Sequence, residues 1–232
     1  MHEVVNGIAQ REGVELAIVP RGTGWDFART HRIPNRLDEA FRIAMEGKAR
    51  QFDLGRASYC ANGVEKTAWF GNAGSVGMSG AVAAKANRTT KVFGAKTSYL
   101  LALGAVFARW SNVHLDVDVD GDRRSGPMED VIVAIGRYQA GGMMVTPGAE
   151  PDDGLFDVLL IRDATKAEVL RALPKIYRGT HLPHPKTELL RGRIVQVSSR
   201  EALPVQLDGE QPGTTPARFE IVPGAVRLRV PG

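Results

Sequence analysis

The stretch Glu15–Thr30, which reads ELAIVPRGTGWDFART, decides the fold of the first part of the chain. Its apolar run predicts a buried strand over Glu15–Pro20, and the glycines that follow predict a tight turn. A helix is expected over Asp26–Thr30. A glycine turn that leaves a strand and enters a helix exposes backbone N–H groups, which suit a phosphate group.

Helices are predicted on both sides of this stretch, over His2–Arg11 and Arg36–Glu46, where apolar residues recur at helical spacing. The order helix, strand, loop, helix is typical of an α/β layer. Further along, Asn62-Gly63 predicts a hairpin turn, and Lys96–Trp110 predicts an amphipathic helix.

Strands dominate the second half of the chain. Val113–Asp120 alternates apolar and polar residues, which indicates a strand with one buried face. A helix is predicted over Thr165–Tyr177, with Thr165 as N-cap and Glu168 completing a capping box. Further strands are predicted over Val131–Ile135, Phe156–Ile161, Arg193–Ser199, Pro204–Leu207, Ala217–Val222 and Ala225–Val230.

Composition excludes several classes of protein. With 43% hydrophobic and 24% charged residues, the 232-residue chain is neither disordered nor fibrous. The net charge is +4, but no polybasic block or aromatic-interleaved basic stretch points to nucleic acid as a partner. The longest apolar run, about Tyr99–Ala108, is roughly half the length that crosses a bilayer. The single cysteine, Cys60, excludes an internal disulfide and fits a reducing cytoplasm.

Two apparent metal motifs do not hold. The aspartates from Asp116 to Asp120 imitate the start of a calcium loop, but Pro127 stands where the bidentate glutamate belongs. His181 and His184 are three residues apart, but the prolines around them disrupt a helix that could pair them. The aspartate segment is therefore interpreted as a solvated strand face, and the histidine segment as a loop.

Three segments contain residues that could bind a ligand or take part in catalysis. In the first, residues 20–28, Thr23 offers a hydroxyl donor and Asp26 could act through a metal ion. In the second, Pro147–Asp157, carboxylates and carbonyls of a Pro/Gly loop suit a hard cation, although an acidic turn is the favoured interpretation of the segment alone. In the third, Gln206–Glu210, Asp-Gly after a strand is usually a turn, and the second carboxylate makes a general base conceivable.

Together these segments resemble the soluble bacterial lipid kinases with a diacylglycerol-kinase-type catalytic domain, which are similar to sphingosine kinase and NAD kinase. The family motifs LPxGTxNDFA, PxAxxDDGxLDV and xxDGE correspond in order to Val19–Ala28, Pro147–Asp157 and Leu207–Glu210. The chain begins where the family's GGDGT loop ends, so an N-terminally truncated chain is expected. Trp25 is a second departure, because the family has asparagine there.

The resemblance implies an α/β plus β-rich fold. An incomplete NAD-kinase-like α/β nucleotide-binding domain is expected over residues 1–64, with residues 218–232 returning to it. A β-sandwich-like lipid-binding domain is expected over residues 65–217.

The resemblance also implies an ATP-dependent lipid kinase, with Asp208 as general base and Glu210 supporting its loop. The residues expected at the nucleotide are Met1, His2, Gly22, Thr23, Gly24, Asp26 and Arg29. A structural metal site away from the chemistry is expected at Glu150, Asp153 and Leu155. ATP and Mg²⁺ are the implied cofactors, with Ca²⁺ an alternative at the structural site.

The implied substrate is a lipid alcohol such as diacylglycerol, and the implied location is cytoplasmic with peripheral attachment to the membrane. Basic residues near the start of the chain could contact an anionic membrane: Arg29, Arg32, Arg36 and Arg42. The oligomeric state stays open, with a homodimer among the choices. Two other functions stay open: a non-catalytic remnant that binds a lipid or metal, and an NAD-kinase-like enzyme with a soluble substrate.

Overall fold

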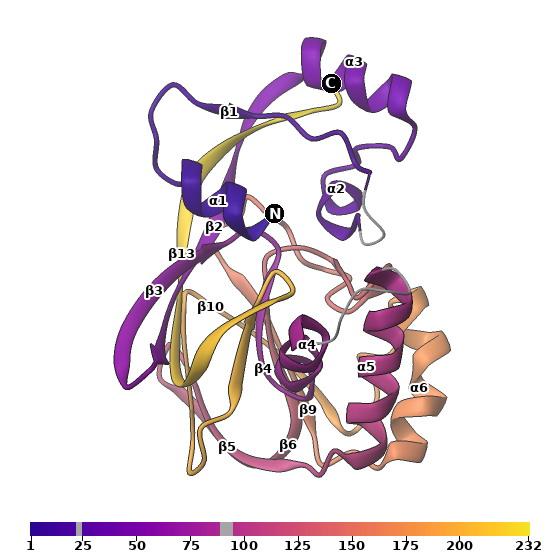
Figure 1. Cartoon of the computed structure of the whole chain (residues 1–232), viewed down its shortest axis with the longest axis vertical. Helices are drawn as coiled ribbons and strands as arrows, with labels where there is room; N and C mark the ends of the chain where they lie inside the picture. Colours follow the sequence, from indigo (N-terminus) through magenta and orange to yellow (C-terminus); the bar gives the residue numbers. More distant parts are fainter. Residues whose placement is uncertain (22–24, 89–94) are drawn as a thin grey trace.

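The computed structural model of the chain describes residues 1–21, 25–88 and 95–232. Two bodies lie one above the other, and two long strands run through both (Figure 1). These strands are β2 (Lys48–Ala61) and β13 (Glu210–Val230), which pair antiparallel from Lys48 opposite Val230 to Cys60 opposite Thr214. The two bodies are therefore joined by this pair of strands as well as by loops.

The upper body packs short elements against the ends of these two strands. Its elements are α1 (His2–Ile8), β1 (Glu15–Leu16), α2 (Asp26–Thr30) and α3 (Leu37–Glu46). Its core is a cluster of buried apolar side chains from the helices and the two strands, among them Val5, Phe27, Phe52, Leu54 and Leu228. β1 runs parallel to β13, as expected of an α/β layer.

The lower body is built on a sheet whose pairings close on themselves. Its ring runs β5–β6–β4–β12–β13–β11 and returns to β5. The remaining members of the ring are β4 (Ala73–Gly77), β5 (Val113–Val119), β6 (Asp122–Ala134), β11 (Ile194–Ser199) and β12 (Pro204–Leu207). The expected β-rich domain is confirmed, and the closed ring makes it a barrel rather than two open sheets.

The barrel interior is close-packed. Phe70 stacks on Phe156 with ring centroids 5.8 Å apart and meets Phe219 edge-on at 6.0 Å. A Cβ at Gly74 would lie only 2.6 Å from the Phe219 ring, so glycine is what lets β4 approach this cluster. The strands that extend the ring are β3 (Val64–Phe70), β9 (Phe156–Arg162) and β10 (Thr187–Gly192), and β7 (Tyr138–Gln139) and β8 (Met143–Met144) form a separate small ribbon.

Three helices, α4 (Met78–Arg88), α5 (Ala95–Arg109) and α6 (Lys166–Arg178), stand beside the barrel (Figure 1). The predicted capping box of α6 is confirmed: the Thr165 side chain accepts from the Glu168 N–H, and the Glu168 carboxylate accepts from the Thr165 N–H. None of the described helices is long and apolar enough to span a membrane.

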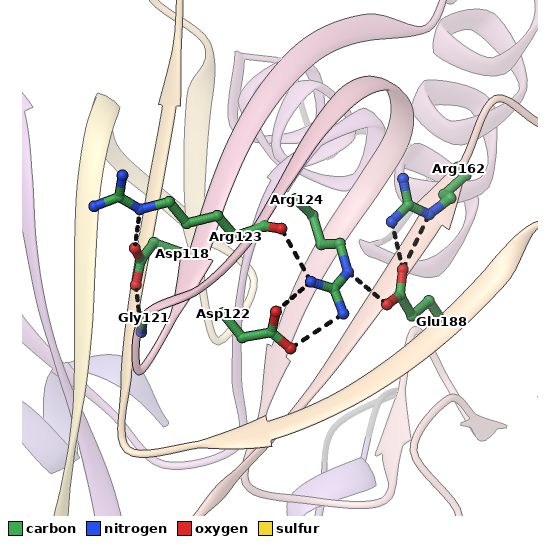
Figure 2. A network of polar contacts seen from close by, with 7 residues as sticks. All are labelled: Asp118, Gly121, Asp122, Arg123, Arg124, Arg162 and Glu188. Atoms are coloured by element: carbon green, nitrogen blue, oxygen red, sulfur yellow. Dashed lines mark hydrogen bonds and ion pairs between the residues drawn. The ribbon is translucent and has the colours of Figure 1, made fainter.

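An ion-pair network holds the outer strands of the barrel together (Figure 2). Arg124 of β6 binds Asp122 and Glu188, and Arg162 of β9 binds the other oxygen of Glu188. Arg123 binds Asp118 at 2.9 Å. Isolated exposed pairs stabilise a protein little, but a shared carboxylate such as Glu188 fixes β6, β9 and β10 relative to one another.

Most predicted elements are confirmed and a few boundaries are wrong. Asn62 and Gly63 both have positive φ and form the predicted hairpin turn. The first helix ends at Ile8 rather than Arg11, because Gln10 turns into the left-handed region. The strand predicted over Glu15–Pro20 is only two residues long, since only these two find a partner on β13.

The two last predicted strands are also wrong as separate elements. Ala217–Val222 and Ala225–Val230 are parts of the single strand β13, which continues through a shift in register between them. Other predictions are confirmed closely: Pro204–Leu207 is β12, and the alternation from Val113 places Leu115, Val117 and Val119 in the core.

Candidate active site

Asp208 occupies the tight turn between β12 and β13. The backbone φ is 49° at Asp208 and 93° at Gly209, a conformation that aspartate and glycine adopt more readily than other residues. The Asp208 carboxylate accepts three backbone hydrogen bonds: Oδ2 from Gly71 at 2.8 Å, and Oδ1 from Asn72 at 2.9 Å and Ala73 at 3.1 Å. The turn therefore holds the carboxylate in one fixed position. Glu210 follows as the exposed first residue of β13.

The electrostatic setting of Asp208 suits a base. Burial raises the pKa of the Asp208 carboxyl above its ordinary value, while the three N–H groups and the nearby His2 act in the opposite direction. A carboxylate offers about four acceptor positions, and three are filled here. The remaining position can accept a hydrogen bond from a substrate hydroxyl, which is the contact that a general base needs.

The N-terminal helix is anchored next to this carboxylate. The Asn6 side chain accepts from the Trp69 N–H at 2.8 Å and donates to the Trp69 carbonyl at 2.8 Å. This two-point contact fixes α1 to the end of β3, just before Gly71. It places His2 close enough to influence Asp208, while Met1 is 40% exposed. Asn6 was not among the expected site residues.

Asp26 and Arg29 form a second group on α2. Asp26 is buried; its Oδ2 accepts from the Gly141 N–H at 2.8 Å, and its Oδ1 has no hydrogen-bond partner among the described residues. The Arg29 Nη1 lies 3.8 Å from that free oxygen. The Arg29 guanidinium lies 4.3 Å from the ring centroid of Trp25 and 5.2 Å from that of Tyr138. Trp25 therefore supports the arginine as a cation–π partner.

Asn72 connects the two groups. Its backbone N–H binds Asp208, and its side-chain Nδ2 donates to the Tyr138 carbonyl at 2.9 Å. The Tyr138 ring in turn contacts Arg29. The structure thus links Asp208 to the α2 group through Asn72 and Tyr138. Three expected members, Gly22, Thr23 and Gly24, lie outside the described residues.

The acidic loop after Pro147 forms a separate site. Both Asp153 oxygens already have partners, because Oδ1 accepts from the Leu155 N–H at 3.0 Å and Oδ2 binds Arg191. Arg191 also lies 3.5 Å from Asp157, a carboxyl whose pKa is raised by burial. Glu150 is exposed. Within the described part of the chain, no three His, Cys, Asp or Glu side chains converge on a single point.

Asp53 of β2 fixes this loop and was not predicted. Its two oxygens accept from the Gly154 N–H at 2.7 Å and the Gly224 N–H at 2.8 Å, and its own N–H donates to the Pro151 carbonyl at 2.9 Å. The buried carboxylate therefore ties the acidic loop to β2 and β13.

A large apolar cavity adjoins the site. Its volume is about 350 Å³, and its walls come from the outer face of the sheet and from all three helices of the lower body. Apolar lining residues include Met78, Leu103, Phe107, Ile132, Leu159 and Ile176. Gln139 and Ala140 line it directly before Gly141, which binds Asp26. A cavity of this size and character suits an alkyl chain.

Two buried acidic residues of β6 interrupt the apolar lining. Glu129 and Asp130 are each 3% exposed, and burial raises the pKa of Glu129 to about 7 and of Asp130 to about 8. Asp130 Oδ2 accepts from the Ser79 N–H at 3.2 Å, at the start of α4. Glu129 Oε2 and Asp130 Oδ1 lack partners among the described residues.

Comparison with known families gives two consecutive matches. Residues 1–57 match the model of the diacylglycerol kinase catalytic domain. Residues 72–230 match the model described as YegS C-terminal NAD kinase beta sandwich-like domain. The two matches together cover both bodies of the fold.

Individual relatives agree with this. A diacylglycerol kinase of Mycobacterium tuberculosis (strain ATCC 25618 / H37Rv) is 30% identical over 222 residues, which are 94% of this chain and 70% of that protein. A diacylglycerol kinase of Staphylococcus carnosus (strain TM300) is 27% identical over 220 residues, covering 94% and 69%. The crystal structure of a diacylglycerol kinase from Bacillus anthracis str. Sterne matches 98% of this chain and 71% of its own, with 19% identity and a TM-score of 0.70. That likeness supports the fold.

Proposed function

The chain belongs to the diacylglycerol kinase family, and from that premise we propose that it transfers the γ-phosphoryl group of ATP to a hydroxyl group of a lipid alcohol such as diacylglycerol. One observation carries the proposal for this particular chain. The Asp208 carboxylate, held by three backbone N–H groups, is connected through Asn72 to a buried acid and an arginine, beside an apolar cavity.

In this proposal Asp208 is the general base. A lipid hydroxyl donates to the carboxylate position that the backbone leaves open. The proton passes to Asp208 as the lipid oxygen attacks the γ-phosphorus, the bond from that phosphorus to the β,γ-bridging oxygen breaks, and ADP leaves. Burial, which raises the pKa of Asp208, makes it a stronger base than an exposed aspartate. Glu210 supports the same turn from the start of β13.

The α2 group fits a bound polyphosphate and its cation. ATP with Mg²⁺ supplies the phosphoryl group. Asp26 offers a buried oxygen without a hydrogen-bond partner among the described residues, and Arg29 offers a guanidinium held by two aromatic rings. The carboxylate suits the cation or its water, and the arginine suits phosphate oxygens. The remaining proposed nucleotide contacts are Met1, His2, Gly22, Thr23 and Gly24.

A second, structural cation stays part of the proposal, at Glu150, Asp153 and Leu155, where Mg²⁺ or Ca²⁺ would bind. Arg191 occupies an Asp153 oxygen, so a cation there would compete with the arginine. We also propose a domain boundary between residues 64 and 65, a cytoplasmic location and peripheral attachment to the membrane.

The cavity favours a lipid over a soluble substrate. Its walls are almost entirely apolar, whereas a nucleotide acceptor such as NAD would need many polar partners. The test is a transfer assay with γ-labelled ATP and Mg²⁺, offering diacylglycerol in micelles or NAD⁺ in solution. Label in the organic phase supports the proposal. Label on NAD alone favours the soluble-substrate enzyme, and label on neither acceptor favours a binding module.

A further inference from the structure

Helix α6 carries apolar side chains on its inward face and at the edge of that face. Val169, Leu173 and Ile176 face inward and line the cavity. At the edge, Leu170 is 55% exposed and Tyr177, seven residues later and so on the same side of the helix, is 50% exposed. Burial of the inward face explains why α6 packs on the lower body, but it leaves the outward face without a partner within the described residues.

The outward face of α6 also carries positive charge. Its exposed basic residues are Arg171, Lys175 and Arg178. The one acidic residue of the helix, Glu168, is engaged in the capping box. The charge on this face is therefore not balanced within the helix, and it favours an anionic partner.

The basic residues of α6 differ from the arginines on the outer strands of the barrel in having no carboxylate partner within the described part of the chain. Arg123, Arg124 and Arg162 on the barrel each bind a carboxylate (Figure 2). Arg171 and Arg178 of α6 form no ion pair with any residue that the structure describes, and neither does Lys175. Uncompensated cations gathered on one exposed helix face are typical of a surface that binds anions.

The same face lies at the mouth of the cavity. Leu170 both lines the cavity and is more than half exposed, so the cavity reaches the surface beside it. Helix α5, which also lines the cavity through Leu103 and Phe107, adds an exposed Leu101 (61%) and the exposed Arg109. Both helices stand on the same side of the lower body (Figure 1).

We propose that the outward face of α6, which we define by Leu170, Arg171, Lys175, Tyr177 and Arg178, docks on an anionic phospholipid bilayer. Apolar side chains flanked by lysine and arginine are the composition of helices that lie in the bilayer interface. The cavity mouth then faces the membrane, and an alkyl chain enters it without crossing water. The proposal depends on the proposed lipid-kinase function in one respect only: that function is the reason for choosing a lipid bilayer as the partner.

Helix α3 is the competing surface. Leu37, Phe41 and Met45 are 54%, 60% and 64% exposed at helical spacing. However, that helix has three acidic residues, Asp38, Glu39 and Glu46, and one basic residue, Arg42. The Arg36 beside it is already paired with two of the acids, so the helix carries net negative charge. An anionic bilayer would repel this helix, which is why α6 is favoured.

The test is co-sedimentation of the whole chain with vesicles, without ATP or lipid substrate. Phosphatidylcholine vesicles are compared with vesicles that also contain phosphatidylglycerol. We expect tighter binding to the anionic vesicles. Each basic residue near such a surface contributes roughly fivefold, so the triple variant Arg171→Ala/Lys175→Ala/Arg178→Ala should bind about a hundredfold more weakly.

The matched control removes the same charge elsewhere, with Arg11→Ala/Arg193→Ala/Arg200→Ala, three exposed arginines that lie on neither α6 nor α3. Its vesicle binding should stay within a few-fold of the unmodified chain. Equal loss in both triple variants would overturn the proposal, because only total charge would then matter. Single variants, beginning with Arg171→Gln, repeat the measurement if the triple variant unfolds.

Two further results separate the alternatives. If Leu37→Ser/Phe41→Ser abolishes vesicle binding and the α6 variant does not, α3 is the docking surface and the proposal is wrong. If the unmodified chain shows no preference for anionic vesicles, it is also wrong. Because no turnover is measured, a failure of the kinase assay leaves this result unaffected, and the two proposals fail independently.

Discussion

We predict that Glu129 makes the folded protein less stable as the pH rises. It lies in the wall of the apolar cavity, 3% exposed, and its Oε2 has no partner among the described residues. Burial raises its pKa from 4.5 to about 7. The folded protein therefore holds a proton that the unfolded chain releases in this range, and folding becomes less favourable as the pH increases.

The magnitude follows from the size of the shift. One pKa unit corresponds to about 1.4 kcal/mol of free energy. Because the pKa of Glu129 is 4.5 in the unfolded chain and about 7 in the folded protein, its favourable contribution to the free energy of unfolding is fully present below pH 4.5 and is lost above pH 7. Between pH 5 and pH 8 the free energy of unfolding should fall by about 2.5 kcal/mol through this residue. Burial raises the pKa of Asp130 as well, which adds a loss of the same sign.

The assay is urea unfolding of the unmodified chain and of Glu129→Gln at pH 5 and pH 8. Glutamine does not titrate, so the variant should lose about 2.5 kcal/mol less than the unmodified chain over this interval. Glu65→Gln, an exposed glutamate on β3, is the matched control and should follow the unmodified chain. If Glu129→Gln declines as steeply as the unmodified chain, Glu129 is not buried as described.

Three smaller predictions concern contacts away from Asp208. Asp53→Asn replaces an acceptor of two buried N–H groups with an amide, and urea unfolding should show a loss of about 1–3 kcal/mol; no loss would contradict the anchoring role. Thr165→Ala removes the α6 N-cap and should cost about 1 kcal/mol in the same assay, against Thr165→Ser, which keeps the hydroxyl. Arg191→Ala frees Asp153 and Asp157, so Ca²⁺ or Mg²⁺ should raise the melting temperature of this variant more than that of the unmodified chain; an equal response would count against a cation there.

Local features of the fold could be predicted from the sequence because their partners are close in the chain. The α6 capping box joins Thr165 to Glu168, and the β12–β13 turn needs only Asp208 and Gly209. The barrel could not be predicted in the same way. Its closure depends on β5 pairing with both β6 and β11, and β11 lies far away in sequence.

The same distinction applies to the candidate site. The motifs pointed to Asp208 and Asp26, but not to the partners of Asn6 and Asn72. Asn6 is fixed by Trp69, and Asn72 joins Asp208 to Tyr138, so each of these contacts spans more than sixty positions. The sequence spacing of an asparagine carries no sign of such a partner. The position of this cavity likewise could not be predicted, because its walls come from eight helices and strands.

The most direct test of the proposed chemistry is Asp208→Asn in the transfer assay with ATP, Mg²⁺ and diacylglycerol. Asparagine keeps the shape of the side chain but cannot take a proton from the lipid hydroxyl. We predict that kcat falls by about 10²–10⁴-fold, while Asp122→Asn, the same change on the exposed edge of the barrel, leaves it unchanged. Turnover by Asp208→Asn within a few-fold of the unmodified chain would contradict the assignment of Asp208 as the base.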